Sequence, residues 1–165
     1  MEYVGLQGDE VHEAYGRYGS SRVSCVYCIM ASAADLLAAS TCTENQAIYR
    51  EMVELEIRST FSFQSGRWLG DVAPGLLDSS MRSALLGAKG RAQAREAAEA
   101  DLPDELLFTK GWPTFVPSLD QARLIARVRR QVADAVGLDI QFTDAQAVQH
   151  RYAQLLAKAQ ARATL

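Results

Sequence analysis

The sequence has few of the residues and motifs that mark many other classes of protein. Its 165 residues include only four prolines, which leaves room for long helices. Three cysteines are an odd number and do not suit a framework of disulfides, so we expect reduced thiols. No Ser-His-Asp order, HExxH motif, phosphate-binding P-loop or paired-carboxylate pattern is present. No catalytic residue is therefore assigned from the motifs.

Charge and hydropathy exclude further classes. A net charge of −3 predicts no general affinity for nucleic acid. The longest apolar stretch, residues 23–39, is interrupted by Asp35 and is too short to span a bilayer. The amino-terminal sequence MEYVGLQGDE lacks the basic region and the apolar core of a signal peptide. We therefore expect a cytoplasmic protein with no membrane partner.

The residues that are present indicate a folded, all-α protein. Apolar residues make up 48% and charged residues 22% of the chain, which is the balance of a globular domain and not of a disordered segment. Capping boxes of the form Ser/Thr-x-x-Gln precede apolar residues at helical spacing after Thr43, Ser118 and Thr143. No convincing run of alternating residues indicates a strand. The sequence predicts a single helical domain over residues 1–165, with about five to six helices.

The elements can be placed from caps and breakers. Glycines interrupt residues 1–24, which we expect to form an irregular loop segment. Ser24 is a suitable N-cap for a helix that runs from Cys25 to about Ser40. A second helix is expected from Thr43 to about Thr60, followed by a short helix and an alanine-rich helix before Pro103. The last two helices are expected from Ser118 to Gly137 and after Thr143.

Two cysteines of this expected helix lie next to an arginine. Cys25 and Cys28 would share one helical face, and the first turn of a helix favours thiolate over thiol. Thiolates bind zinc or an iron–sulfur cluster, whereas the same backbone N–H groups with Arg22 suit phosphate or sulfate. Cys42 is the one further thiol that could join a metal site.

Other interpretations of these cysteines stay open. Cys25 falls on the same helical line as Ile29, Ala33 and Leu36, and free cysteine is often a core residue. A catalytic redox pair is a third interpretation, although a thioredoxin-type pair needs a βαβ context that the sequence lacks. From the residues alone, core packing, metal binding and redox chemistry all remain.

A family resemblance bears on this choice. The segment VHEAYGRYGSSRVSCVYCIMASAADLLAA, followed by QAIYREMVELE and TFSF, resembles the C-terminal part of phosphoadenosine phosphosulfate reductase-like proteins. These belong to the adenine-nucleotide α-hydrolase (PP-loop) superfamily, and the likeness is to its bacterial and phage branch. In that branch a His-Pro-x-Tyr segment precedes a loop ending in Arg-x-Ser-Cys-x-x-Cys. The match is specific over residues 11–63 and looser through DQARLIARVRRQVADAVGL and TDAQAVQHRYAQLLA.

The chain also departs from that family. The family's nucleotide domain is a parallel α/β sheet with a Ser-Gly-Gly-x-Asp-Ser loop, and this chain has neither. Glu13 stands where the family usually has proline, and the cysteine-bearing tail of the sulfate-assimilation reductases is absent. The chain thus resembles the back half of an oxidoreductase of sulfur metabolism. We expect no activity on an adenylyl substrate from the chain alone.

The resemblance implies roles for five residues. Arg22 would contact the phosphate or sulfate end of an adenine nucleotide, with His12 and Tyr15 at the border of the same anion-binding pocket. Cys25 and Cys28 would be metal ligands for an iron–sulfur cluster or zinc. Cys42, which the resemblance does not include, completes our predicted ligand set as the remaining thiol. The implied partner is a nucleotide-binding PP-loop domain or subunit, and the nucleotide would bind only in that complex. The alternative function is a stand-alone helical protein-interaction module with structural core cysteines.

A basic stripe raises the further interpretation of DNA binding. Arg123, Arg127 and Arg130 recur at helical spacing away from the valine face. Asp120 and Asp134 lie on nearly the same stripe, which favours a solvated face with local ion pairs over a DNA partner.

Overall fold

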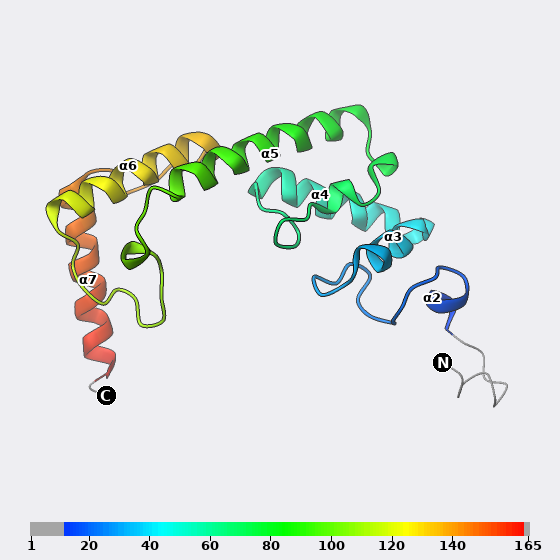
Figure 1. Ribbon diagram of the computed structural model, residues 1–165, viewed down its shortest axis with the longest axis horizontal. Coiled ribbons are helices and arrows are strands. Elements are labelled where there is room, and N and C mark those ends of the chain that lie inside the picture. The colour runs from blue at the N-terminus through cyan, green and yellow to red at the C-terminus, as the bar shows by residue number, and fades with distance from the viewer. Residues whose placement is uncertain (1–11, 164–165) are drawn as a thin grey trace. The chain divides into compact units, whose positions relative to one another are not determined.

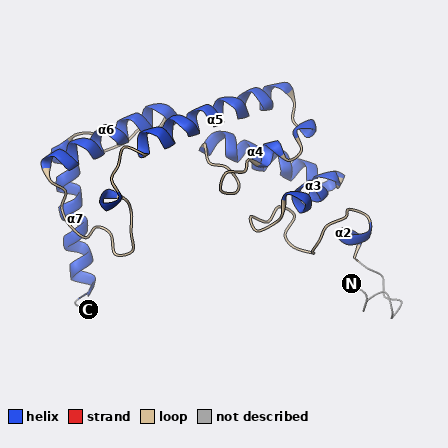
Figure 2. Cartoon of the chain, in the orientation of Figure 1, coloured by secondary structure: helices blue, strands red, loops and turns tan. Residues whose placement is uncertain are grey.

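The computed structural model describes residues 12–163, and within that range all regular structure is helical (Figure 2). Six α-helices, labelled α2 to α7 in Figure 1, are joined by loops and four 3₁₀ turns. The only strand-like pairing in the described range is an isolated bridge between Gln64 and Arg67. The all-α prediction is confirmed. Among the described residues, none of the helices is both long enough and apolar enough to cross a membrane.

By their internal contacts the residues divide into two compact units, which meet in the sequence between Lys89 and Gly90. The division falls within one continuous helix, α5, and the prediction of a single domain over 1–165 stays a prediction. The first unit contains α2 (Glu13–Gly16), α3 (Ala33–Thr41), α4 (Gln46–Ser59) and the start of α5 (Ser79–Glu99). The second contains the end of α5, α6 (Leu119–Val136) and α7 (Ala145–Ala163).

The first unit is built around α4. Tyr49 and Val53, one turn apart on this helix, are fully buried and meet Leu36 of α3 and Leu69 of the following loop. The Tyr49 hydroxyl donates to the carbonyl of Leu69 at 2.8 Å and accepts from the backbone N–H of Ala73 at 3.0 Å. This tyrosine therefore fixes the loop after α4 both by packing and by hydrogen bonds.

A buried carboxylate on the same helix organises that loop. Glu56 is 4% exposed and accepts from the backbone N–H groups of Phe63 and Leu69 at 2.7 Å and of Gly70 at 3.0 Å. Burial raises the pKa of Glu56, and the three N–H donors oppose that rise. The side chain thereby supplies partners to backbone groups that no sheet or helix satisfies.

The second unit rests on the packing of α6 against α7. Ala122, Ile125 and Ala126 of α6 are buried against Val148 of α7 and Leu106 of the preceding loop. The predicted Ser118–Gln121 capping box is present, with bonds of 3.2 and 2.8 Å. Helix α6 ends at Gly137, whose φ of 74° lies in the left-handed region, as the sequence predicts.

The structure corrects several predicted helix boundaries. The cysteine helix does not begin at Cys25. Helix α3 begins at Ala33, because the Ser32 hydroxyl accepts from the N–H of Asp35 and caps it, while the Ser24 hydroxyl donates to the Cys25 carbonyl. The predicted loop segment 1–24 contains the short helix α2, and its residues 1–11 lie outside the described range.

Two of the three predicted capping boxes are also wrong. Residues Thr43–Asn45 form a 3₁₀ turn ahead of α4, and neither start carries a side-chain cap. At α7 the capping acceptor is Asp144, which binds the N–H of Ala147 at 2.8 Å, so the cap lies one residue after the expected Thr143. The short helix and the alanine-rich helix expected before Pro103 are a single helix, α5, which tolerates Gly87 and Gly90.

We predict that Glu56→Gln destabilises the first unit. The amide replaces one acceptor oxygen by a donor that faces backbone N–H groups, so at least one buried donor loses its partner, at a cost of about 1–3 kcal/mol. Urea denaturation measures the loss, and hydrogen exchange at the Leu69 and Gly70 amides should accelerate with it. Glu54→Gln, at an exposed position of the same helix, should change neither. Equal stability of the two variants would contradict the assigned role of Glu56.

Candidate functional site

The loop that carries Cys25 and Cys28 is held by one carboxylate. Asp35, in the first turn of α3, accepts from the Ser21 N–H at 2.6 Å and from the hydroxyls of Ser20, Ser21 and Ser32 at 3.2, 2.9 and 2.7 Å. The side chain is 7% exposed. The Ser21 N–H bond, followed by the serine hydroxyl bonds, lowers the pKa of Asp35 well below its ordinary value. An ionised carboxylate therefore fastens residues 20–21 to the N-terminus of α3.

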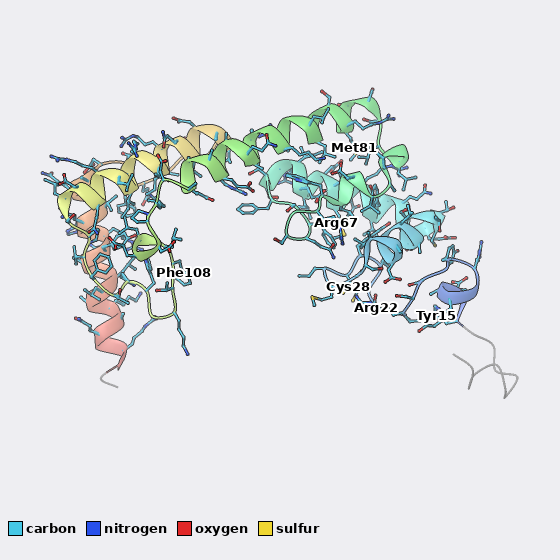
Figure 3. The ribbon with its side chains drawn as sticks, viewed as in Figure 1. Tyr15, Arg22, Cys28, Arg67, Met81 and Phe108 are labelled. Atoms are coloured by element: carbon cyan, nitrogen blue, oxygen red, sulfur yellow. The ribbon has the colours of Figure 1, made fainter. Side chains whose placement is uncertain are left out.

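This anchoring places Arg22 in the wall of a cavity of about 520 Å³ within the first unit. Its lining includes four of the six predicted site residues: His12, Arg22, Cys25 and Cys42. Tyr15 and Cys28 are not among the lining residues. Figure 3 shows Arg22 and Cys28 on the same loop, with Tyr15 on the segment of α2. The structure thus brings together three of the five residues that the family resemblance selected, and Cys42 lines the same cavity.

Arg22 has donors that the protein does not use. Its Nε and Nη2 atoms are buried and have no hydrogen-bond partner. Buried guanidinium nitrogens without acceptors are costly, because they have lost water and gained nothing in its place. The planar fork of arginine suits two oxygens of one phosphate, sulfate or carboxylate group. These two nitrogens are the donors that an oxyanion bound at Arg22 would occupy.

The cavity also has acidic residues, so its summed charge does not by itself favour an anion. Glu13 pairs with Arg17 at 3.6 Å, and Asp35 is occupied by its serines. Glu44 accepts from the Cys42 thiol at 3.0 Å, and this bond lowers the pKa of Glu44. Each carboxylate has a partner, whereas no ion pair of Arg22 occurs in the described residues. Any preference for an anion rests on the position of Arg22.

His12 and Tyr15 have structural contacts. The Nδ1 atom of His12 accepts from the Ala14 N–H at 3.1 Å and caps α2, which leaves Nε2 as the donor of the neutral ring. The Tyr15 hydroxyl accepts from the Val23 N–H at 3.3 Å. Tyr15 therefore positions the residue that follows Arg22, and His12 contributes to the cavity lining.

The three cysteines differ in their surroundings. Cys25 is exposed and lies in the loop, so neither the helix-dipole argument nor the core-facing line expected for it holds. Cys28 is half-buried against the core of the first unit, and its sulfur accepts from the Met30 N–H at 3.4 Å. Cys42 is half-buried and donates to Glu44, and a hydrogen bond with Cys42 raises the pKa of Tyr18.

The cysteines as arranged do not complete a metal site. Over residues 12–163, no group of three histidine, cysteine or acidic side chains is placed to hold a metal ion. A structural zinc site needs four ligands and an iron–sulfur cluster usually four thiolates. The predicted ligand set of Cys25, Cys28 and Cys42 stays a prediction, and no chemistry is derived through a metal.

The basic stripe of α6 is largely paired. Arg123 binds Asp120 at 2.9 Å, Arg127 binds Asp101 at 3.1 Å, and Arg130 donates to the Thr143 carbonyl. A solvated face with local ion pairs is what the structure shows. DNA binding by this stripe stays a prediction.

Comparison with known proteins adds no relative: no family model, curated protein or solved structure matches the chain. The resemblance to phosphoadenosine phosphosulfate reductase-like proteins therefore depends on the motif residues alone.

Sequence reasoning missed Asp35, the residue that orders the site. A signal was present, since Ser32-x-x-Asp35 before an apolar run is itself a capping pattern. The contacts of Asp35 to Ser20 and Ser21 had no such signal, because they join residues 14 and 15 positions apart.

We predict that Asp35→Asn changes the response of the first unit to acid. A depressed pKa in the folded state means that the wild-type carboxylate stabilises the fold above its ordinary pKa of 3.8 and that this contribution is lost as pH falls below it. The variant should be less stable at pH 7, and the difference should shrink between pH 4 and pH 2.5. Thermal denaturation across this range measures the effect, with exposed Glu51→Gln as the control. A constant difference at all pH values would exclude the ionised Asp35 network.

Proposed function

We propose that the chain is the C-terminal, cysteine-containing module of a phosphoadenosine phosphosulfate reductase-like protein, and that it completes a pocket for a phosphate or sulfate group. The observation that carries this proposal is the pair of buried, unpartnered nitrogens of Arg22 in the cavity wall. Arg22 is also the arginine of the family-like Arg-x-Ser-Cys-x-x-Cys motif. Geometry and resemblance therefore select the same residue independently.

In this role the protein binds and orients the anion. Arg22 would donate two hydrogen bonds to oxygens of a phosphate or sulfate, and the Nε2–H of His12 would be a third donor at the cavity lining. Asp35 and Tyr15 keep the loop in place without touching the anion.

The loop beside the cavity has the character of a docking surface. Val23, Ile29 and Met30 are 52%, 64% and 76% exposed, although all three are apolar. Several exposed apolar side chains on one short loop are a feature of protein interfaces. The proposed partner is a PP-loop nucleotide domain or subunit, which would cover this loop and close the cavity over the anionic end of an adenine nucleotide.

The same exposed loop also favours a second candidate, a stand-alone helical interaction module. In that case the loop would bind a protein partner, and Arg22 would have no ligand. The two candidates differ in one measurable property: only the first requires an oxyanion at Arg22.

We predict that inorganic sulfate or phosphate stabilises the protein through Arg22. Two charge-assisted hydrogen bonds should contribute enough that Arg22→Gln weakens anion affinity by roughly 10- to 100-fold. Thermal-shift titration and isothermal calorimetry at constant ionic strength measure this affinity. Arg58→Gln removes an equal charge at an exposed position of α4 outside the cavity and should leave the affinity unchanged. Stabilisation that both variants retain would refute the anion pocket and favour the interaction module.

We further predict that any metal binding requires the partner. The described residues of the chain lack a full ligand set, so anaerobically purified chain alone should contain neither iron nor zinc in stoichiometric amount by elemental analysis. Co-purification with a PP-loop partner should add metal if the cysteines are ligands, and Cys25→Ser should then remove it. Stoichiometric metal in the chain alone would show that Cys25, Cys28 and Cys42 rearrange into a site.

A further inference from the structure

The second unit contains a cavity of about 590 Å³ that the proposed function does not use. Its floor is formed by side chains of the second core, including Leu106, Ile125 and Val148, which are buried. Two arginines and no acidic residue are among its lining residues. From this arrangement we propose that the second unit binds a small planar aromatic anion, with its ring against the aromatic wall and its acidic group at the arginines.

The aromatic wall has three rings in sequence. Phe108 and Trp112 lie with their centroids 5.9 Å apart, and Trp112 meets Tyr152 of α7 edge to face at 5.0 Å. Phe108 is 80% exposed, and its position on the loop ahead of α6 is labelled in Figure 3. An exposed ring at the mouth of an apolar cavity can stack on a flat ligand at little further cost.

The two arginines make the charge of the cavity lining positive. Arg129 of α6 donates to the Gln141 carbonyl at 2.9 Å, and the Arg151 guanidinium of α7 lies 5.5 Å from the centre of the Phe142 ring. Neither arginine has an ion pair among the described residues. Arg123 and Arg127 of the basic stripe, in contrast, each pair with an aspartate. With no carboxylate in the lining, these two charges favour a ligand with an acidic group.

Phe142 adds one more ring to this cavity, and its backbone has a left-handed conformation. Its φ of 59° lies in the left-handed region, which a bulky residue without glycine's freedom adopts only at a cost. The ring lines the cavity and supports Arg151. A strained backbone conformation is kept only where the surrounding structure fixes it, and such residues are frequent at ligand-binding sites.

The size of the cavity favours a small molecule over a macromolecule. A volume of several hundred Å³ is typical of a site for a single ligand of drug-like size. A small ligand would also cover the exposed Phe108 ring.

The test uses two fluorescent probes that differ by one charge. 1-Anilinonaphthalene-8-sulfonate is an aromatic anion with a flat naphthalene ring, and N-phenyl-1-naphthylamine is its counterpart without the sulfonate. Both are titrated into the full chain in the Trp68→Phe background, so that quenching of the remaining Trp112 locates the probe in the second unit. We expect one sulfonate probe per chain to quench Trp112, with a tighter affinity than the uncharged probe.

Three variants separate ring contacts from charge. Arg151→Gln should weaken the sulfonate probe roughly five- to tenfold and leave the uncharged probe unchanged, and Arg151→Lys should restore part of the difference. Phe108→Ala should weaken both probes, and exposure of this side chain means that the fold should survive the change. Arg123→Gln, on α6 but outside the cavity lining, is the charge control.

The proposal is overturned if the sulfonate probe binds no better than the uncharged one, if it fails to quench Trp112, or if Arg151→Gln weakens both probes alike. An affinity for both probes that is unchanged in Phe108→Ala would also place the probe elsewhere. None of these results depends on Arg22, so the anion pocket of the first unit and the aromatic cavity of the second can fail separately.

Discussion

The carboxylate of Asp35 is the interaction on which the candidate site depends. Residues 20–32 have no helix or sheet of their own apart from turns, and their conformation is set where the chain is tied to the N-terminus of α3. Four bonds to one ionised group hold Ser20, Ser21 and Ser32 together, and Arg22 follows directly from the tied residues. A loop fixed at this point can keep a guanidinium in a cavity wall. A free loop would let the same side chain turn to water.

Arg22 lies on this loop and has hydrogen-bond donors that no protein group uses. Two of its nitrogens are buried without acceptors, although three carboxylates line the same cavity. Those carboxylates are bonded to serine hydroxyls, Arg17 and the Cys42 thiol, and none of them accepts from Nε or Nη2 of Arg22. The unsatisfied donors are therefore a property of the network as a whole. The oxyanion that we propose for this pocket would satisfy them.

The sequence predicted the helical class, the capping box of α6 and its end at Gly137, because these depend on residues close together in the chain. The sequence prediction misplaced the start of α3 by eight residues, because Ser24 and Ser32 are equally good N-caps by residue type. Asp35 decides between them through its bonds to serines distant in the sequence. Four of the six predicted site residues share a cavity, whereas the helix that was expected to align Cys25 with Cys28 is absent. No sequence motif predicted the cavity of the second unit, because its lining residues come from separate stretches of the chain.

Both loops of the first unit are held by an acidic side chain that accepts from backbone N–H groups, yet burial gives the two acids opposite responses to pH. Glu56 is surrounded by the core, and desolvation outweighs its three N–H donors, so its pKa rises. Its contribution to stability is therefore largest at low pH and declines as pH rises through the folded pKa. Asp35 sits where hydrogen bonds outweigh desolvation, its pKa falls, and its contribution is lost on acidification. The loop that carries Arg22 should accordingly loosen in acid before the loop that Glu56 holds, because only the first depends on a carboxylate that must stay ionised.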